Sequence, residues 1–241
     1  MAGQKNAQAK TKVTGRGNEA KEVLRTIIGD ISFKPKNERQ KEFYKIMEDS
    51  EIIICAGPAG VGKSYLTILK ALELLVSPDN EFYKIVLTTP AVEADEKHGF
   101  LPGDIDEKMA PYIYSSLYLI EKIIGKRRAA TLMSSEFIQI MPLAYMRGIN
   151  VDNSILIAEE FQNSTKRQTK TMLTRIGWKS KFIISGDLEQ SDRYVNNKES
   201  GLYDALNRLK DIDGIGIFKF EKEDVVRNKI IAKILDTYEK E

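Results

Sequence analysis

Residues 57–64 read GPAGVGKS, directly after the apolar run EIIICA (51–56) and directly before YLTILKALELLV (65–76). The stretch matches the pattern G-x-x-x-x-G-K-[ST], in which glycines let successive backbone N–H groups turn toward a phosphate. A strand before the loop and a helix after it are the context that this loop requires, and the helix adds the positive end of its dipole. The stretch therefore predicts a nucleotide-binding strand–loop–helix unit.

The side chains of this loop have different expected tasks. Lys63 supplies a positive charge to the outer phosphates of ATP, and Ser64 supplies a hydroxyl for Mg²⁺. The alternative is a glycine-rich turn that binds nothing. The residues expected to contact the nucleotide are Gly57, Pro58, Ala59, Gly60, Val61, Gly62, Lys63, Ser64 and Tyr65.

The second half of such a site is an acid at the end of a neighbouring strand. The run ILIAEEFQN (155–163) supplies Glu159 and Glu160 directly after its apolar residues. We expect Glu159 to hold Mg²⁺ through water and Glu160 to polarise the attacking water. Two adjacent acids after a strand are usually solvated, but a P-loop upstream favours the functional interpretation.

A third candidate segment is SGDLEQSD (185–192), which follows another apolar run. Gly186, Asp187 and Gln190 are expected beside the P-loop, at the carboxyl edge where open α/β sheets bind ligands. Gln190 would hydrogen-bond the γ-phosphate and the attacking water. The alternative is a polar strand-to-helix turn.

The fold class follows from short apolar, β-branched runs that alternate with helical patterns. Such runs suit strands buried on both faces of a parallel sheet, joined by right-handed crossovers. The sequence predicts one α/β domain over 19–241. Strands are expected at 51–56, 84–89, 136–141, 154–159, 181–186 and 214–220, and helices at 19–29, 38–49, 63–76, 112–124, 166–176, 201–210 and 226–240.

Composition narrows the class of protein further. Cys55 is the only cysteine and His98 the only histidine, which excludes an intrachain disulfide and a zinc cage and fits a reducing cytoplasm. No apolar run is long enough to span a membrane. Residues 1–36 carry eight Lys/Arg and three acidic residues. We expect 1–18 to be a disordered basic arm that touches nucleic acid or, equally, a solubilising tail.

At this point the sequence resembles the PhoH family, phosphate-starvation-inducible ATPases related to superfamily 1 helicases. The resemblance covers about 37–236 and is carried by RQKEFYKIMEDSEIIICAGPAGVGKSYLT, TTPAVEADEKHGFLPGDIDEKMAPY, MPLAYMRG, EEFQN, SGDLEQSD, ESGLYDAL and EDVVR. The short single-domain form resembles those of bacteriophages, which would place the protein in the host cytoplasm. The family implies a RecA-like ATP-binding fold.

The resemblance also implies roles for individual residues. Gln40 corresponds to a glutamine that reads adenine, Gln190 to a phosphate sensor, and Arg227 to the arginine of a closing DVVR motif. Glu159 and Glu160 fall on the family's Asp-Glu pair. Glu159 departs from that pattern by one methylene, which leaves ATP binding expected and puts the efficiency of hydrolysis in doubt.

A single RecA-like domain lacks the second domain from which two-domain helicases supply an arginine to the transition state. A neighbouring copy would then supply it, and a head-to-tail contact that repeats by rotation closes into a ring. We expect a homo-oligomer, most simply a hexamer. Arg227 is the first candidate for the finger, although a surface role is the alternative; Arg147 and Arg193 are second candidates.

Such a ring suits single-stranded RNA or DNA, and several residues could contact it. Candidates are Thr89, Lys97 and His98 in one segment, and Tyr145 with Arg147 in LAYMRG (143–148). GKRRAA (125–130), near Tyr112, Tyr114 and Tyr118, is another, although tyrosines on an amphipathic helix more often pack than stack. His98 is more often structural or exposed.

Three functions remain open from sequence. The first is an ATP-dependent motor on single-stranded nucleic acid, with possible helicase activity. The second is a small-molecule kinase, for which no arginine-bearing lid or acceptor pocket is visible. The third is a nucleotide-gated scaffold with weak or no hydrolysis, which the change at Glu159 keeps open.

Overall fold

The computed structural model describes residues 19–90 and 105–226, with the backbone alone between 105 and 112. Its six-stranded sheet has the order β3-β2-β4-β5-β1-β6, and each neighbouring pair is parallel. All six predicted strands are present. They are β1 (Ile52–Ala56), β2 (Lys84–Thr88), β3 (Ile138–Ile140), β4 (Ser154–Ala158), β5 (Lys181–Gly186) and β6 (Ile215–Lys219).

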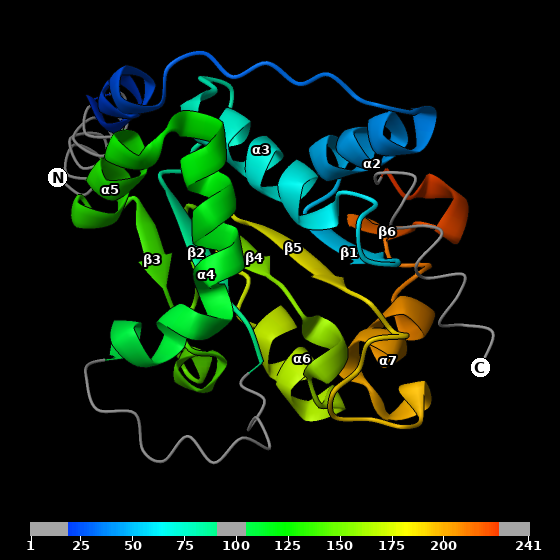
Figure 1. Cartoon of the computed structure of the whole chain (residues 1–241). Coiled ribbons are helices and arrows are strands. Elements are labelled where there is room, and N and C mark those ends of the chain that lie inside the picture. Colours follow the sequence, from blue (N-terminus) through cyan, green and yellow to red (C-terminus); the bar gives the residue numbers. More distant parts are fainter. Residues whose placement is uncertain (1–18, 91–104, 227–241) are drawn as a thin grey trace, which may run out of the picture.

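Helices cover both faces of this sheet (Figure 1). Residues 19–28 form a first helix. The others are α2 (Glu38–Asp49), α3 (Lys63–Val76), α4 (Ile105–Ile124), α5 (Lys126–Ser134), α6 (Lys166–Leu173) and α7 (Gly201–Arg208). Four short 3-10 turns complete the described elements: η1 (Leu143–Met146), η2 (Phe161–Asn163), η3 (Asn197–Glu199) and η4 (Lys222–Asp224).

Alternating side chains divide the core into two layers. In β1, Ile53 and Cys55 join a buried cluster with α2, α3, α4 and α5, whereas Ile54 and Ala56 join another with α6 and α7. Both faces of the strand are therefore apolar, because helices cover both. The fold is the predicted α/β arrangement, a parallel sheet between two layers of helices.

The helices after β2 differ from the prediction in two ways. The helix expected at 112–124 begins at Ile105, and a separate helix, α5, follows it. Gly125, with φ 89°, separates the two. The charges of GKRRAA suggested a basic patch and concealed that Ala129 and Leu132 pack into the core. The predicted final helix at 226–240 and the arm at 1–18 lie outside the described residues.

The sheet order corrects one expectation about the site. We expected the strand that carries the two acids to lie next to the strand before the P-loop, but β5 lies between β1 and β4. Gly186 at the end of β5 therefore lies beside Ala56, and the acids come from one strand further. All three strand ends still meet at the carboxyl edge of the sheet.

Candidate nucleotide-binding site

The P-loop connects the end of β1 to the start of α3. Gly62 caps α3 in the left-handed region, with φ 101°, which a glycine adopts without the cost that a side chain would bring. At Gly57 a Cβ atom would lie 2.6 Å from the Cβ of Phe220, so only glycine allows this close approach. The two glycines thus fix the loop's close approach to Phe220 and its entry into α3.

Lys63 is the cation of this loop, and it is partly buried. Its ammonium donates to the backbone oxygens of Gly57 and Pro58, at 2.5 and 2.9 Å. Burial lowers the pKa of Lys63, while the nearby thiol of Cys55 and the carboxylates of the site oppose that shift. A cation held by carbonyl oxygens of its own loop is ready to exchange them for phosphate oxygens.

Glu159 follows β4 and is buried, with 6% of its surface exposed. Burial raises the pKa of Glu159, and hydrogen bonds from the Ser116 and Ser64 hydroxyls oppose the rise. Ser116 of α4 donates to Oε2, whereas Oε1 has no hydrogen-bond partner among the described residues. An orphaned carboxylate oxygen beside a serine hydroxyl fits the oxygen ligands that Mg²⁺ prefers.

Glu160 lies in the left-handed region, with φ 53°, a conformation uncommon outside glycine. Its carboxylate accepts a 2.7 Å hydrogen bond from the amide of Gln162. The same amide donates to the Gln190 backbone at 3.2 Å, and its oxygen accepts from the Asp187 N–H at 3.0 Å. Gln162 therefore ties the second acid to the loop after β5.

Asp187 connects that loop to the P-loop. Its Oδ2 accepts the backbone N–H of Ala59 at 3.0 Å, and its Oδ1 accepts that of Glu189 at the same distance. At Gly186 a Cβ atom would lie 2.5 Å from the Gln162 amide oxygen, so the close packing depends on glycine. The P-loop and Glu160 are thus joined by one chain of hydrogen bonds through Asp187 and Gln162.

A pocket of about 360 Å³ brings together most of the predicted P-loop residues, the two acids and Gln190, whereas Gly57, Pro58 and Val61 do not line it. Its lining includes Lys63 and Ser64 from the P-loop and Gln190 from the loop after β5. Ser116 and Gln162 support the site, and no sequence pattern identifies their roles: Ser116 belongs to no motif, and Gln162 simply follows the two acids in EEFQN. The pocket is lined by Ala59, Gly60, Gly62, Lys63, Ser64, Tyr65, Leu119, Glu159, Glu160, Ser185, Gly186, Asp187 and Gln190.

Gln40 lies behind the loop and not in this lining. Its amide nitrogen donates to the Val61 carbonyl at 3.0 Å, and its amide oxygen accepts from the Lys36 N–H at 2.9 Å. The side chain is buried. Gln40 therefore fastens the P-loop to the segment before α2, and its contact with adenine stays a prediction.

The residues predicted to contact nucleic acid differ in their exposure to solvent. Thr89 is only 3% exposed, so its hydroxyl offers no surface to a strand in this conformation. Tyr145 is 54% exposed and Arg147 is exposed, as a contact would require. Lys97, His98 and Arg227 lie outside the described residues.

The structure describes Arg147 and Arg193, the second candidates for the arginine finger, and Val226, the residue before Arg227. Arg147 and Arg193 are both exposed, and neither lines the pocket at the P-loop. Val226, directly before Arg227, donates its N–H to the Gly60 carbonyl at 3.2 Å. The chain thus contacts its own P-loop at Val226, and Arg227 lies outside the described residues.

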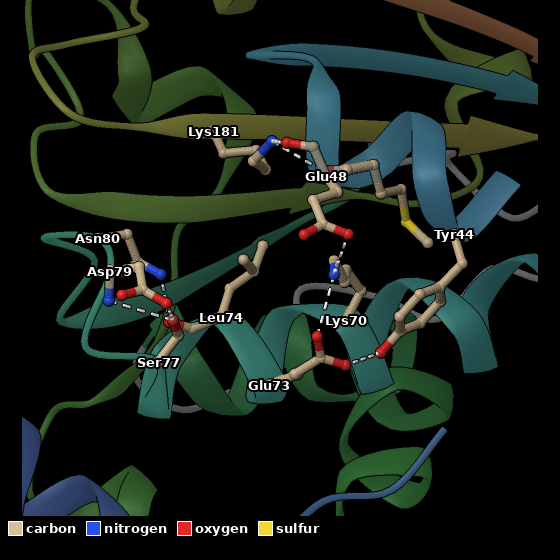
Figure 2. Close-up of polar contacts among 10 residues, drawn as sticks. Tyr44, Glu48, Lys70, Glu73, Leu74, Ser77, Asp79, Asn80 and Lys181 are labelled. Carbon is tan, nitrogen blue, oxygen red and sulfur yellow. Dashed lines mark hydrogen bonds and ion pairs between the residues drawn. The ribbon is translucent and has the colours of Figure 1, made fainter. Parts of the chain in front are cut away.

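A larger cavity, of about 840 Å³, lies at the amino edge of the sheet. There Lys181 donates to the Met47 and Glu48 carbonyls, at 2.7 and 3.2 Å, and to Ser50. Lys70 donates to Glu73 at 3.0 Å and to Glu48 at 3.5 Å (Figure 2). These two lysines are buried and already have partners, so we interpret this amino-edge lysine cluster as structural.

Comparison with known proteins agrees with this geometry. A family model described as PhoH-like protein matches residues 32–239. The chain belongs to the PhoH-like protein family. It is 41% identical over 210 residues to the PhoH-like protein of Bacillus subtilis (strain 168), covering 87% of this chain and 65% of that protein.

Other relatives support the same family. Protein PhoH of Escherichia coli (strain K12) is 38% identical over 205 residues, covering 84% of this chain and 57% of that protein. This PhoH-like chain therefore spans less than two thirds of the lengths of both relatives.

The fold also has solved neighbours. The large terminase of a thermophilic bacteriophage aligns with a TM-score of 0.52 at 10% identity, covering 84% of this chain and 50% of the terminase. The likeness concerns the fold alone, a parallel sheet flanked by helices. No helix among the described residues of this PhoH-like chain has the length and apolar character to cross a membrane.

Proposed function

We propose that this chain binds ATP with Mg²⁺ and hydrolyses it to ADP and phosphate. One observation carries the proposal: a single pocket contains the Lys63 cation, Glu159 with its unpartnered oxygen, and the second acid Glu160. A buried carboxylate oxygen without a partner is uncommon in a purely structural ion-pair network. An arrangement that is incomplete in this way supports a ligand between the P-loop and the acids.

The binding half of the reaction falls to the P-loop. Its backbone N–H groups and the Lys63 ammonium would hold the phosphate oxygens, and Asp187 keeps Ala59 in place. Ser64 would hold Mg²⁺ through its hydroxyl, and Glu159, whose Oε1 has no partner among the described residues, would hold it through water. When bound, that ion neutralises charge on the phosphate oxygens.

The hydrolytic half falls to Glu160 and Gln190. A water attacks the γ-phosphorus, the bond to the ADP oxygen breaks, and the water's proton passes to the Glu160 carboxylate. Gln162 orients that carboxylate through its 2.7 Å hydrogen bond. Gln190 would hold the water against the γ-phosphate. Two carboxylates and a glutamine suit water as the acceptor better than a second substrate.

We propose further that turnover is coupled to single-stranded RNA or DNA. The exposed pair Tyr145 and Arg147 offers a ring for a base and a charge for a phosphate. Thr89 would need to leave its buried position to take part. Lys97 and His98 remain proposed contacts from their place in the sequence.

An arginine must still reach the developing charge. We propose a homo-oligomeric ring, most simply a hexamer, in which Arg227 completes the site of a neighbouring copy. Arg147 and Arg193, both exposed, are second choices. A solution mass equal to one chain with and without ATP would reject the ring. Loss of turnover in Arg227→Ala with ATP affinity retained would support the finger.

A second function, nucleotide-gated assembly without productive hydrolysis, is favoured by one observation. Glu159 stands where the family has aspartate, and its Oε2 is held by Ser116. If the longer side chain holds the ion away from the phosphates, ATP would bind and remain intact. The rate of phosphate release decides between the two functions.

The test is phosphate release from Mg·ATP at low salt, with and without an unstructured single-stranded RNA. Release that the RNA accelerates is expected, and the acceleration should decline steeply as salt rises because phosphate contacts release counterions. Phosphate transferred to an added small-molecule acceptor would favour a kinase. ATP binding without release would favour the scaffold.

A further inference from the structure

The outer face of α4 carries two exposed aromatic side chains. Tyr114 is 68% exposed and Tyr118 is 52% exposed. They lie one helical turn apart, with ring centroids separated by 6.5 Å and ring planes inclined by 20°. Two neighbouring large rings presented to solvent differ from a scattered surface residue and indicate a binding surface.

The opposite face of α4 explains why these rings do not pack. Ile113 and Ile120 are buried against the sheet, and Ser116 is buried beside Glu159. An α-helix presents residues four apart on one side, so Tyr114 and Tyr118 point away from that core. The expectation that tyrosines on this helix pack is therefore wrong for these two.

Positive charge follows the two rings along the chain. Lys122 lies one turn beyond Tyr118 on α4 and is exposed, and Lys126 and Arg127 at the start of α5 are exposed as well. Arg128 differs, because its guanidinium donates to the Ile28 carbonyl at 3.3 Å. Rings followed by cations form a strip, which we call the α4 strip: Tyr114, Tyr118, Lys122, Lys126 and Arg127.

We propose that the α4 strip binds single-stranded nucleic acid, with bases stacked on the two tyrosines and phosphates held by the three cations. The inference rests on the proposed coupling to nucleic acid and names a surface for it. Parallel rings accept the faces of any base, and cations alongside match a phosphate backbone. Glu121, three residues after Tyr118, is the neighbouring carboxylate on α4 and is only partly exposed. It leaves the three cations in excess, which suits a phosphate backbone better than a protein partner.

The strip and the ATP pocket share one helix. Ser116 donates to Glu159, and Leu119 lines the pocket at the P-loop. Tyr114 and Tyr118 alternate with these residues along α4, on its outer side. A strand bound to the strip would therefore act on a helix that directly contacts the proposed Mg²⁺ carboxylate, which supplies a physical route for coupling.

The test measures the affinity of the full chain for fluorescent single-stranded RNA and DNA oligomers of about 15 nucleotides. The double variant Tyr114→Ala/Tyr118→Ala should bind roughly 10- to 100-fold more weakly. Tyr114→Phe/Tyr118→Phe keeps both rings and should stay within about twofold. Lys122→Gln should remove one phosphate contact, so the slope of log affinity against log salt should become shallower by about 1.

Trp178→Ala is the matched control, because Trp178 is 87% exposed at the amino edge, away from the strip. It should leave oligomer affinity unchanged. A double tyrosine variant that melts like wild type and binds the oligomers equally well overturns the inference and leaves the proposed function standing. Wild type that binds no oligomer overturns both. If the double variant forms a smaller protein assembly than wild type but still binds the RNA and DNA oligonucleotides, the strip would be assigned to self-association of the protein.

Discussion

Two lysines lie at opposite edges of one sheet and meet different surroundings. Lys63, at the carboxyl edge, donates to carbonyl oxygens of its own loop and faces Glu159, whose Oε1 has no partner among the described residues. Lys181, at the amino edge, caps α2 through three carbonyls. Burial lowers the pKa of both lysines.

Burial of a lysine alone therefore does not identify a binding site. What distinguishes the two lysines is whether a neighbouring buried polar atom lacks a hydrogen-bond partner. The amino-edge cavity is the larger of the two, yet its lysines already have their hydrogen bonds (Figure 2). The smaller pocket holds the orphaned carboxylate oxygen. Unsatisfied buried polar atoms cost free energy and persist where a ligand completes them.

The largest effect is expected from Glu160→Gln. Because Glu160 is the proposed proton acceptor, phosphate release should fall roughly 10²- to 10⁴-fold while ATP affinity is kept. Glu189→Gln is the control, since that carboxylate is 69% exposed and does not line the pocket. Equal release by wild type and Glu160→Gln would favour the scaffold.

Lys181→Met should act on stability and not on ATP. It leaves the carbonyls at the end of α2 without their donor, at a cost of about 1–3 kcal/mol in the free energy of unfolding, measured by urea denaturation. Lys179→Met is the matched variant, because Lys179 is half exposed and its ion pair with Glu81 contributes little. An unchanged midpoint for Lys181→Met would remove the structural interpretation of the cluster.

The smallest effect is a pH dependence of stability. Burial lowers the pKa of Lys181 to about 8, against about 10.4 in the unfolded chain. Between these values the unfolded state binds more protons, so the stability of the wild type should rise with pH. From pH 8 to 9.5 this contributes about 1–2 kcal/mol, which Lys181→Met should lose. A parallel pH profile in both proteins would contradict the shift.

Much of this arrangement could be predicted from local sequence. The P-loop, the two acids and Gln190 each sit at a strand end, and strand ends of a parallel sheet meet at one edge. The order of the strands could not be predicted, because pairing between β1 and β5 depends on long-range packing that no short pattern records. For that reason the sequence pattern places the two acids on the strand next to β1, whereas β5 lies between β1 and β4.

Other features of the site could not be predicted for the same reason, since they depend on long-range packing. Nothing in the sequence around Ser116 marks it, since its role comes from α4 lying over Glu159. The exposure of Tyr114 and Tyr118 depends equally on which face of α4 meets the sheet. Gln40 was assigned to adenine from the family resemblance, whereas its contacts with Val61 and Lys36 needed the folded loop.

Calorimetric titration of Mg·ATP into Lys63→Met and Lys181→Met tests the central claim most directly, because the same substitution is made at two lysines whose pKa burial lowers. We expect Lys63→Met to lose roughly 100-fold or more in affinity, from the loss of about 3 kcal/mol of charge-assisted hydrogen bonds. Lys181→Met should bind like wild type. Wild-type affinity in a folded Lys63→Met protein would contradict the account.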